Sequence, residues 1–205
     1  MQRTLGLSPG MLAISRCRMI PARLIESVRF RASQMTNELK VELQLASGAT
    51  DEAPGTQCVA RWVNTACEFS GSGELLNDCC VTVRMVDEAE SQQLNFAFRQ
   101  QACPTNVLAF PGAANQEFLP KEAGEEFGDI VICLPLVQRE AAEQHKARDA
   151  HLAHLVVHGT LHLLGFCHDD AESARSMEEL EVKILGELGI PDPYAAGVVV
   201  SEQRC

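Results

Sequence analysis

The chain has 205 residues, of which 46% are apolar and 22% are charged, a composition typical of one well-packed globular domain. It contains no apolar run long enough to cross a bilayer, and its nine cysteines form no C-x-x-C pair and no even disulfide framework. We therefore expect free thiols, a reducing compartment such as the cytoplasm, and no association with a membrane.

The first 34 residues differ in charge from the rest of the chain. They hold six arginines and one acid, so the net charge of −11 is the sum of +5 in this segment and −16 in residues 35–205. Such a segment is typical of a mitochondrial presequence, and it also arises when translation is assigned to a start codon upstream of the true one, here Met35. We favour the upstream start. Residues 1–34 are then a disordered basic extension, and residues 35–205 form a single domain.

The first half of this domain is predicted to contain strands and helices in alternation. Apolar and polar residues alternate over 39–45 and 81–85, which predicts two strands with one buried face each. Helical spacing of apolar residues predicts a short helix around 59–66 and a second helix over 88–98. The second helix is expected to bury Leu94, Ala97 and Phe98. A further short strand is predicted to follow Pro104 and to end at Phe110.

The second half is richer in helices. A polar loop is predicted over 115–128, and the continuous apolar run 129–134 predicts a central strand covered on both faces. Helices are predicted over 135–146, 150–164 and 172–188, and the last should bury Met177, Leu180, Ile184 and Leu188. Elements in this order favour an α+β fold, in which helices pack on a small mixed sheet of about four strands.

Three histidines stand close together around the end of the 150–164 helix. His158 and His162 are four residues apart, so they share one face of the helix and can direct ring nitrogens to one point. Gly165 predicts the end of the helix, because glycine adopts the left-handed conformation without steric cost. His168 can then return to the same point. Three imidazoles suit zinc and leave its fourth position open to a water molecule, so we predict one Zn²⁺ per chain.

Other residues near this site are weaker candidates for metal ligands or catalytic groups. His151 and His154 continue the same helical stripe, and we expect them to lie in the core or behind the ligands rather than at the metal. Cys167 is a possible substitute ligand, but a packing role is favoured because His168 has the better spacing. Gly159 stands where metzincin zinc peptidases have the glutamate that acts as general base. The pattern therefore retains a zinc site while disfavouring peptide hydrolysis.

The segment from His158 to His168 reads HGTLHLLGFCH and resembles the signature H-G-x-L-H-L-x-G-[YF]-x-H of the YbeY family of bacterial rRNA maturation endoribonucleases. The resemblance extends from about Met35 to about Tyr194. It includes four further blocks in the family's order, Val81–Asp87, Leu94–Arg99, Pro104–Pro111 and Gly128–Cys133. Cys167 departs from the usual aspartate. Asn106 and Ala109 stand where the family often has aspartate and serine, so we assign neither a catalytic role.

The resemblance implies a zincin-like metal site on a central helix, and it also implies a specific biochemical function. That function is a single-strand-specific, zinc-dependent endoribonuclease acting in small-subunit rRNA 3′-end maturation and ribosome biogenesis. From physics alone, Arg99 is a solvated side chain stabilised by the dipole at a helix end. The family has a functionally important arginine at this motif position, which implies that Arg99 is catalytic and clamps the phosphate in the transition state.

The net charge of −16 on residues 35–205 disfavours RNA binding, since phosphate contacts require lysine or arginine. We expect the cations to gather on one face, with candidates Arg61, Arg84, Arg99 and Lys121, or the small ribosomal subunit or a ribosome-associated protein to deliver the rRNA precursor. Two alternatives stay open. One is a non-catalytic ribosome-assembly factor that contains zinc, which the open fourth position disfavours. The other is a metallopeptidase, which Gly159 disfavours.

Overall fold

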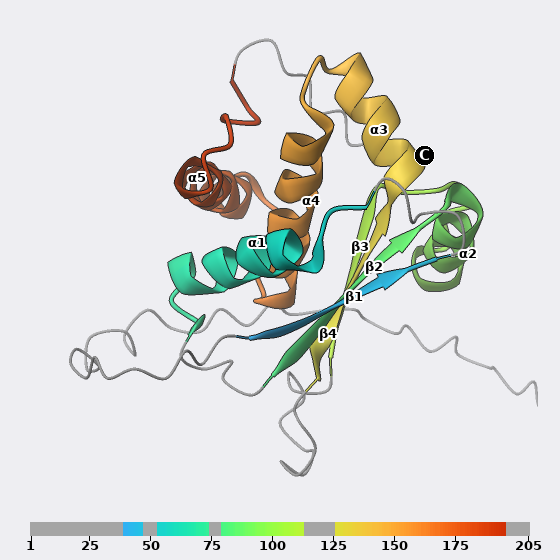
Figure 1. Cartoon of the computed structure of the whole chain (residues 1–205), viewed down its shortest axis with the longest axis horizontal. Coiled ribbons are helices and arrows are strands. Elements are labelled where there is room, and N and C mark those ends of the chain that lie inside the picture. Colours follow the sequence, from blue (N-terminus) through green and yellow to red (C-terminus); the bar gives the residue numbers. More distant parts are fainter. Residues whose placement is uncertain (1–38, 47–52, 74–78, 113–125, 196–205) are drawn as a thin grey trace, which may run out of the picture.

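The computed structural model describes residues 39–46, 53–73, 79–112 and 126–195. Residues 1–34, Lys121 and most of the predicted 115–128 loop lie outside the described residues. Within these ranges the elements follow the order β1, α1, β2, α2, β3, β4, α3, α4 and α5 (Figure 1). The strands are β1 (Lys40–Leu45), β2 (Cys80–Val86), β3 (Val107–Pro111) and β4 (Glu126–Cys133).

The strands form one mixed sheet in the order β1-β2-β4-β3. β1, β2 and β4 are parallel, whereas β3 runs antiparallel to β4 at the edge. Val83 in β2 pairs with Leu43 on one side and Ile130 on the other, which fixes the register of the three parallel strands. The predicted α+β fold with a small mixed sheet is confirmed. Residues 129–133 of the predicted 129–134 strand lie in the inner strand β4, while Leu134 begins the next helix.

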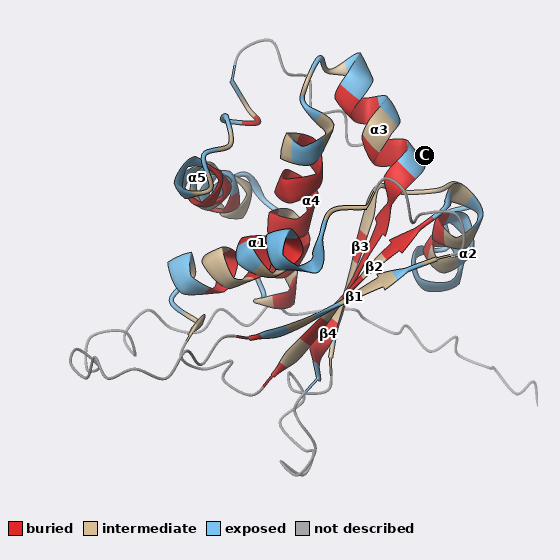
Figure 2. Ribbon diagram, viewed as in Figure 1, coloured by how far each residue is buried: buried red, intermediate tan, exposed pale blue. Residues whose placement is uncertain are grey.

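The main core lies between one face of this sheet and four helices. These are α1 (Thr56–Phe69), α3 (Leu134–Glu143), α4 (Arg148–Leu163) and α5 (Ala171–Glu187). α4 lies against α1, α3, α5 and strands β3 and β4, and it is buried along most of its length (Figure 2). Its apolar run is therefore the centre of the domain. None of the described helices is long and apolar enough to cross a membrane.

The opposite face of the sheet carries a smaller core beneath α2 (Glu88–Arg99). The prediction that α2 buries Ala97 and Phe98 is wrong, since both are exposed. The buried residues of α2 are Ser91 and Asn95, whose side chains donate to the backbone carbonyl oxygens of Thr105 and Cys103. Hydrogen bonds to the segment before β3 thus replace the apolar contact that helical spacing suggested.

Two other expectations concern cysteines and α5. Cys103 is disulfide-bonded, so the expectation of free thiols throughout is wrong, whereas the thiols of Cys58, Cys67, Cys80, Cys133 and Cys167 are free, as predicted. Spacing along the sequence gave no sign of that bond. In α5, Met177 and Ile184 are buried as predicted, while Leu180 and Leu188 are partly buried against the core. A carboxylate that the prediction did not include, Glu181, is fully buried on the same side.

Candidate metal centre

The end of α4 brings His168 back toward the helix. Gly165 adopts a φ of +89°, the left-handed region that favours glycine. The N–H of Phe166 donates to the carbonyl of Leu161, and the N–H of Gly165 donates to the carbonyl of His162, so the last turn closes as a glycine-ended helix cap. The chain reverses over three residues, as the sequence predicted, and His168 lies beside the last turn of the helix.

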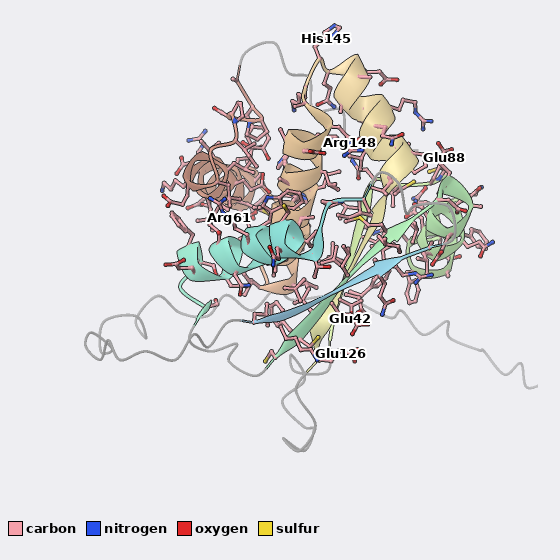
Figure 3. The ribbon with its side chains drawn as sticks, viewed as in Figure 1. Glu42, Arg61, Glu88, Glu126, His145 and Arg148 are labelled. Carbon is pink, nitrogen blue, oxygen red and sulfur yellow. The ribbon has the colours of Figure 1, made fainter. Side chains whose placement is uncertain are left out.

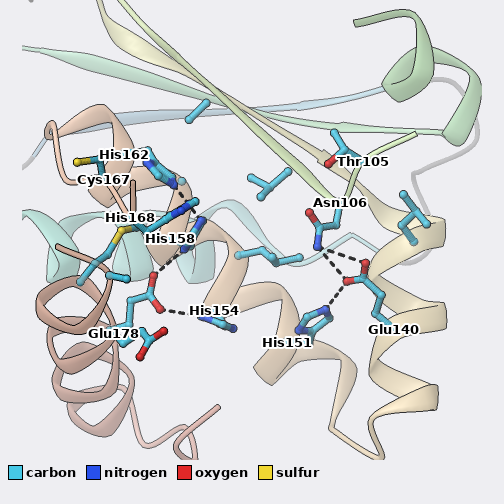
Figure 4. Close-up of a pocket in the computed structure, with 18 of the residues that line it drawn as sticks. Thr105, Asn106, Glu140, His151, His154, His158, His162, Cys167, His168 and Glu178 are labelled. Carbon is cyan, nitrogen blue, oxygen red and sulfur yellow. Dashed lines mark hydrogen bonds and ion pairs between the residues drawn. The ribbon is translucent and has the colours of Figure 1, made fainter. Parts of the chain in front are cut away.

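The structure brings His158, His162 and His168 together, and one ring nitrogen from each lies within 4.8 Å of the others (Figure 4). The Nε2 atoms of His158 and His162 are 3.0 Å apart. Nδ1 of His158 lies 2.7 Å from a carboxylate oxygen of Glu181, and Nδ1 of His162 lies 3.0 Å from the carbonyl oxygen of Phe166. Both partners only accept, so both Nδ1 atoms carry the proton.

In the neutral form that a metal ligand requires, each Nε2 presents a lone pair toward the other. Two lone pairs at this separation repel unless a cation lies between them, and a tetrahedral zinc site places nitrogen ligands at a similar spacing. Burial, together with the neighbouring His158 and His168, lowers the pKa of His162 to about 4. His162 is therefore neutral near pH 7 and able to ligate, so this donor set fits a metal such as zinc.

Glu181 supports this cluster from behind and was missed by the sequence analysis. Its carboxylate accepts from Nδ1 of His158 at 2.7 Å, from Nε2 of His154 at 3.0 Å and from the hydroxyl of Tyr194. Burial alone raises the pKa of this carboxyl, but the hydrogen bonds from His154 and His158 outweigh burial and leave the pKa well below its usual range. The available signal was a charged residue within the apolar stripe of α5.

His154 lies in the core, as expected, and its ring contacts Glu181 and Tyr194 rather than the centre of the three-histidine cluster. Desolvation lowers its pKa, and the hydrogen bond to Glu181 only partly compensates. His154, His158 and Glu181 also form a second group with metal-ligand geometry. The hydrogen bonds from the two histidines and Tyr194 already occupy the Glu181 carboxylate, so we interpret this group as the support of the first.

Gly159 faces the sheet. A Cβ at this position would lie 2.9 Å from Cγ2 of Ile130 and 3.4 Å from Cγ2 of Val107. Any side chain here would therefore push α4 away from β4, since a carbon at 2.9 Å cannot be accommodated without movement. The close approach of helix and sheet explains why this position carries glycine and why no carboxylate can extend from it.

The histidine cluster opens into a groove of about 1160 Å³ that runs along α4. At its other end, Asn106 donates to the carboxylate of Glu140, and Nε2 of His151 lies 2.7 Å from the same group (Figure 4). This second network joins the segment before β3 to α3 and α4. His151 is thus a buried support, as expected. Cys167 lies on the groove wall as a half-buried free thiol.

Arg99 also lines the groove, and it is the single lysine or arginine among the lining residues that the structure describes. In the described ranges it makes no ion pair. The other candidates that the structure describes, Arg61 and Arg84, do not line the groove. Arg84 of β2 pairs with Glu90 of α2 at 2.7 Å. Arg61 lies on α1 (Figure 3). Arg61 and Arg84 therefore add no charge to the groove wall, and the expectation that the cations share one face stays a prediction.

Two histidines on the buried helix α4 and a third on the segment that follows it, all open to a groove, are the arrangement expected of a metal-dependent hydrolase. The profile of a family described as Endoribonuclease YbeY matches residues 46–189. A protein of that name from Stutzerimonas stutzeri is 48% identical over 156 residues, covering 76% of this chain and 92% of the relative. Those from Coxiella burnetii and Halorhodospira halophila are 43% and 46% identical and are covered over 98% and 97% of their lengths. The chain belongs to the YbeY family, so the resemblance seen in the sequence is confirmed.

Proposed function

We propose that the protein is an endoribonuclease that hydrolyses phosphodiester bonds in single-stranded regions of rRNA precursors. Its membership of the YbeY family supports RNA hydrolysis, and the match extends over nearly the whole length of the relatives. The finer assignment, to 3′-end maturation of small-subunit rRNA and to ribosome biogenesis in the cytoplasm, follows from the family resemblance. The observation that carries the proposal is the convergence of three histidines beside a groove that also holds Arg99.

His158, His162 and His168 are the proposed ligands of one zinc ion. When bound there, zinc supplies Lewis-acid activation of water and polarisation of a phosphate oxygen. Glu181 fixes the ring of His158, and the Phe166 carbonyl fixes the ring of His162, so both present Nε2 to the same point. The buried helix and its hydrogen bonds hold these rings before substrate arrives, which lowers the cost of organising the site.

Arg99 is the proposed catalytic clamp on the substrate phosphate. Its guanidinium has no carboxylate partner in the described ranges, so its donors remain available to two phosphate oxygens. Planar, bidentate donors aimed at a phosphate stabilise the additional charge that develops in the transition state. Peptide hydrolysis is disfavoured because Gly159 presents no carboxylate and the sheet leaves no room for one.

A nuclease assay tests the proposal. The protein loaded with zinc, the chelated protein and the His158→Ala variant are compared on a defined single-stranded RNA and on casein. His145→Ala is the matched control, since His145 lies outside the groove lining (Figure 3). We expect zinc-dependent cleavage of RNA only, with loss of both bound zinc and activity in His158→Ala. RNA cleavage that survives in His158→Ala would contradict the proposed site, and zinc-dependent cleavage of casein would favour the peptidase. Full zinc binding without RNA cleavage would favour the non-catalytic assembly factor.

A further inference from the structure

The most exposed apolar side chains of the described chain gather on the last turn of α2. Four large apolar residues are exposed in the described ranges, namely Leu45 in β1 at 38%, Phe69 in α1 at 41%, and Phe96 and Phe98 in α2 at 55% and 59%. Two of the four therefore belong to the sequence Phe96-Ala97-Phe98-Arg99. Burying a phenylalanine normally contributes to stability, so two such residues left in solvent within one helical turn mark an interaction surface.

The two rings flank Arg99 on the surface of the helix. At 3.6 residues per turn, Phe98 is displaced from Arg99 by about 100° around the axis, and Phe96, three residues earlier, is displaced by about 60° on the other side. The buried side of α2 is instead formed by Ser91 and Asn95, which bond to the segment before β3. Phe96 lies away from this side of α2, whereas Phe98 continues the line of Ser91 and Asn95 to the end of the helix, where it packs on Phe110 and stays largely exposed.

Phe98 is held in one orientation although it is exposed. Its ring meets the ring of Phe110 at a centroid distance of 4.7 Å and an interplanar angle of 61°. This contact restricts the side chain before any ligand arrives, and it still leaves 59% of the residue exposed. A fixed aromatic ring beside a cation is a common arrangement for binding an unpaired nucleobase, because the base stacks on the ring while the cation holds its phosphate.

Arg99 links the two phenylalanines to the groove of the histidine cluster, because it follows them on α2 and lines that groove. A single strand alternates flat apolar bases with anionic phosphates, and the side chains Phe96, Arg99 and Phe98 alternate in the same way. We propose that Phe96 and Phe98 form a stacking platform for the unpaired bases on either side of the phosphate held by Arg99. This inference rests on the proposed function and adds a physical basis for single-strand preference, because bases within a duplex cannot present their faces.

The test measures stacking separately from cleavage. Zinc-loaded protein is titrated into a short single-stranded RNA that carries the fluorescent base 2-aminopurine near the cleaved bond, and cleavage is followed on the same sequence with natural bases or with abasic nucleotides. The variants are Phe96→Ala, Phe98→Ala, Phe98→Leu and Phe98→Trp. Phe69→Ala is the matched control, since Phe69 is an exposed phenylalanine on α1 outside the groove lining.

We expect the wild-type protein to quench the fluorescence of the probe. Each alanine variant should reduce quenching and lower kcat/KM on natural RNA by about 5- to 150-fold, the range that aromatic stacking supports. The same variants should match the wild-type protein on abasic RNA, because no base remains to stack. Phe98→Trp should retain activity, and Phe98→Leu should resemble Phe98→Ala although it keeps an apolar side chain. Zinc content and the response of Phe69→Ala should stay unchanged.

Three results would overturn the platform. A kcat/KM of the alanine variants within about twofold of wild type on natural RNA would show that the bases do not stack there, because a twofold change corresponds to a negligible difference in activation free energy. Equal losses on natural and abasic RNA would indicate a structural role for the rings. Normal activity on isolated RNA combined with a defect on ribosomal particles would mean that the surface docks a protein. Quenching without cleavage by the wild-type protein would retain the platform and reject the proposed nuclease activity, so the two failures are distinguishable.

Discussion

Glu181→Gln is the substitution that best tests how the histidine cluster is held. The carboxylate is fully buried and accepts from His158, His154 and Tyr194. Glutamine keeps the volume but replaces one accepting oxygen with an NH₂ group, which then faces another donor. The variant also loses the negative charge that strengthens the bond to His158.

The size of the loss in zinc affinity or stability depends on which hydrogen bond the amide oxygen of the glutamine retains. If its oxygen faces His154 and Tyr194, the ring of His158 loses its partner, and loss of such support typically costs about 10- to 100-fold in metal affinity, or about 1.4 to 2.7 kcal/mol. If the oxygen faces His158, a buried donor on His154 or Tyr194 is left unpaired, which costs about 1 to 3 kcal/mol of stability. Either orientation produces a loss, and the two orientations are separated by measuring zinc affinity and metal-free stability.

The assay is competition for zinc with a chromophoric chelator, together with denaturant unfolding of the metal-free protein. Glu178→Gln is the matched control, because Glu178 is an exposed carboxylate one turn earlier on α5 that lines the same groove. The control should bind zinc like the wild-type protein. The reasoning fails if Glu181→Gln binds zinc within about twofold of wild type and also unfolds at the same denaturant concentration.

Three further substitutions or deletions test other parts of the structure. Arg99→Lys should lose about 100- to 1000-fold in single-turnover RNA cleavage, nearly as much as Arg99→Ala, because an ammonium lacks the two-pronged donor; an active lysine variant would reject the clamp. Gly159→Ala should lower stability by about 1 to 2 kcal/mol, since overpacking against Ile130 at 2.9 Å outweighs the gain in helix propensity, and an unchanged denaturation midpoint would contradict this. Deleting residues 1–34 should leave thermal stability and RNA cleavage near the wild-type values, and a large loss in either would show that the segment packs on the domain.

The part of the site that the sequence predicted is local. The four-residue spacing of His158 and His162, and the turn at Gly165, depend on helix geometry and backbone sterics that a short segment determines by itself. Glu181 reaches the cluster from another helix, so its role depends on how α5 packs against α4, which no spacing encodes. A sequence analysis can still recognise such a residue as a carboxylate at a buried position of an amphipathic helix, because a charge placed there requires partners.

The fold shows the same division at α2. The start of that helix was predictable because Asp87 is a favourable N-cap residue, and its side chain accepts a hydrogen bond from the backbone N–H of Glu90. Its orientation was not, since Leu94 and Phe98 have the spacing of a buried face. Asn95 and Ser91 determine the orientation through hydrogen bonds to Cys103 and Thr105, and these contacts join residues 8 and 14 positions apart. The spacing of apolar residues cannot predict a helix that turns polar side chains toward the sheet.

The charge of the protein leads to a last prediction, on the salt dependence of RNA binding. Several described arginines are already paired with carboxylates, including Arg84 with Glu90 and Arg139 with Glu88, whereas Arg99 is not. Binding to a single strand weakens with salt with a slope of about −0.7 for each phosphate neutralised. A site that depends on one phosphate contact at Arg99 and on stacking should therefore show a shallow slope of about −0.7. Binding of a short single strand, measured by fluorescence anisotropy across a salt series, gives this slope, and Arg99→Ala should bring it close to zero. A slope of about −4 or steeper in the wild-type protein would mean that several other cations contact the RNA, and the single clamp would then be insufficient to explain binding.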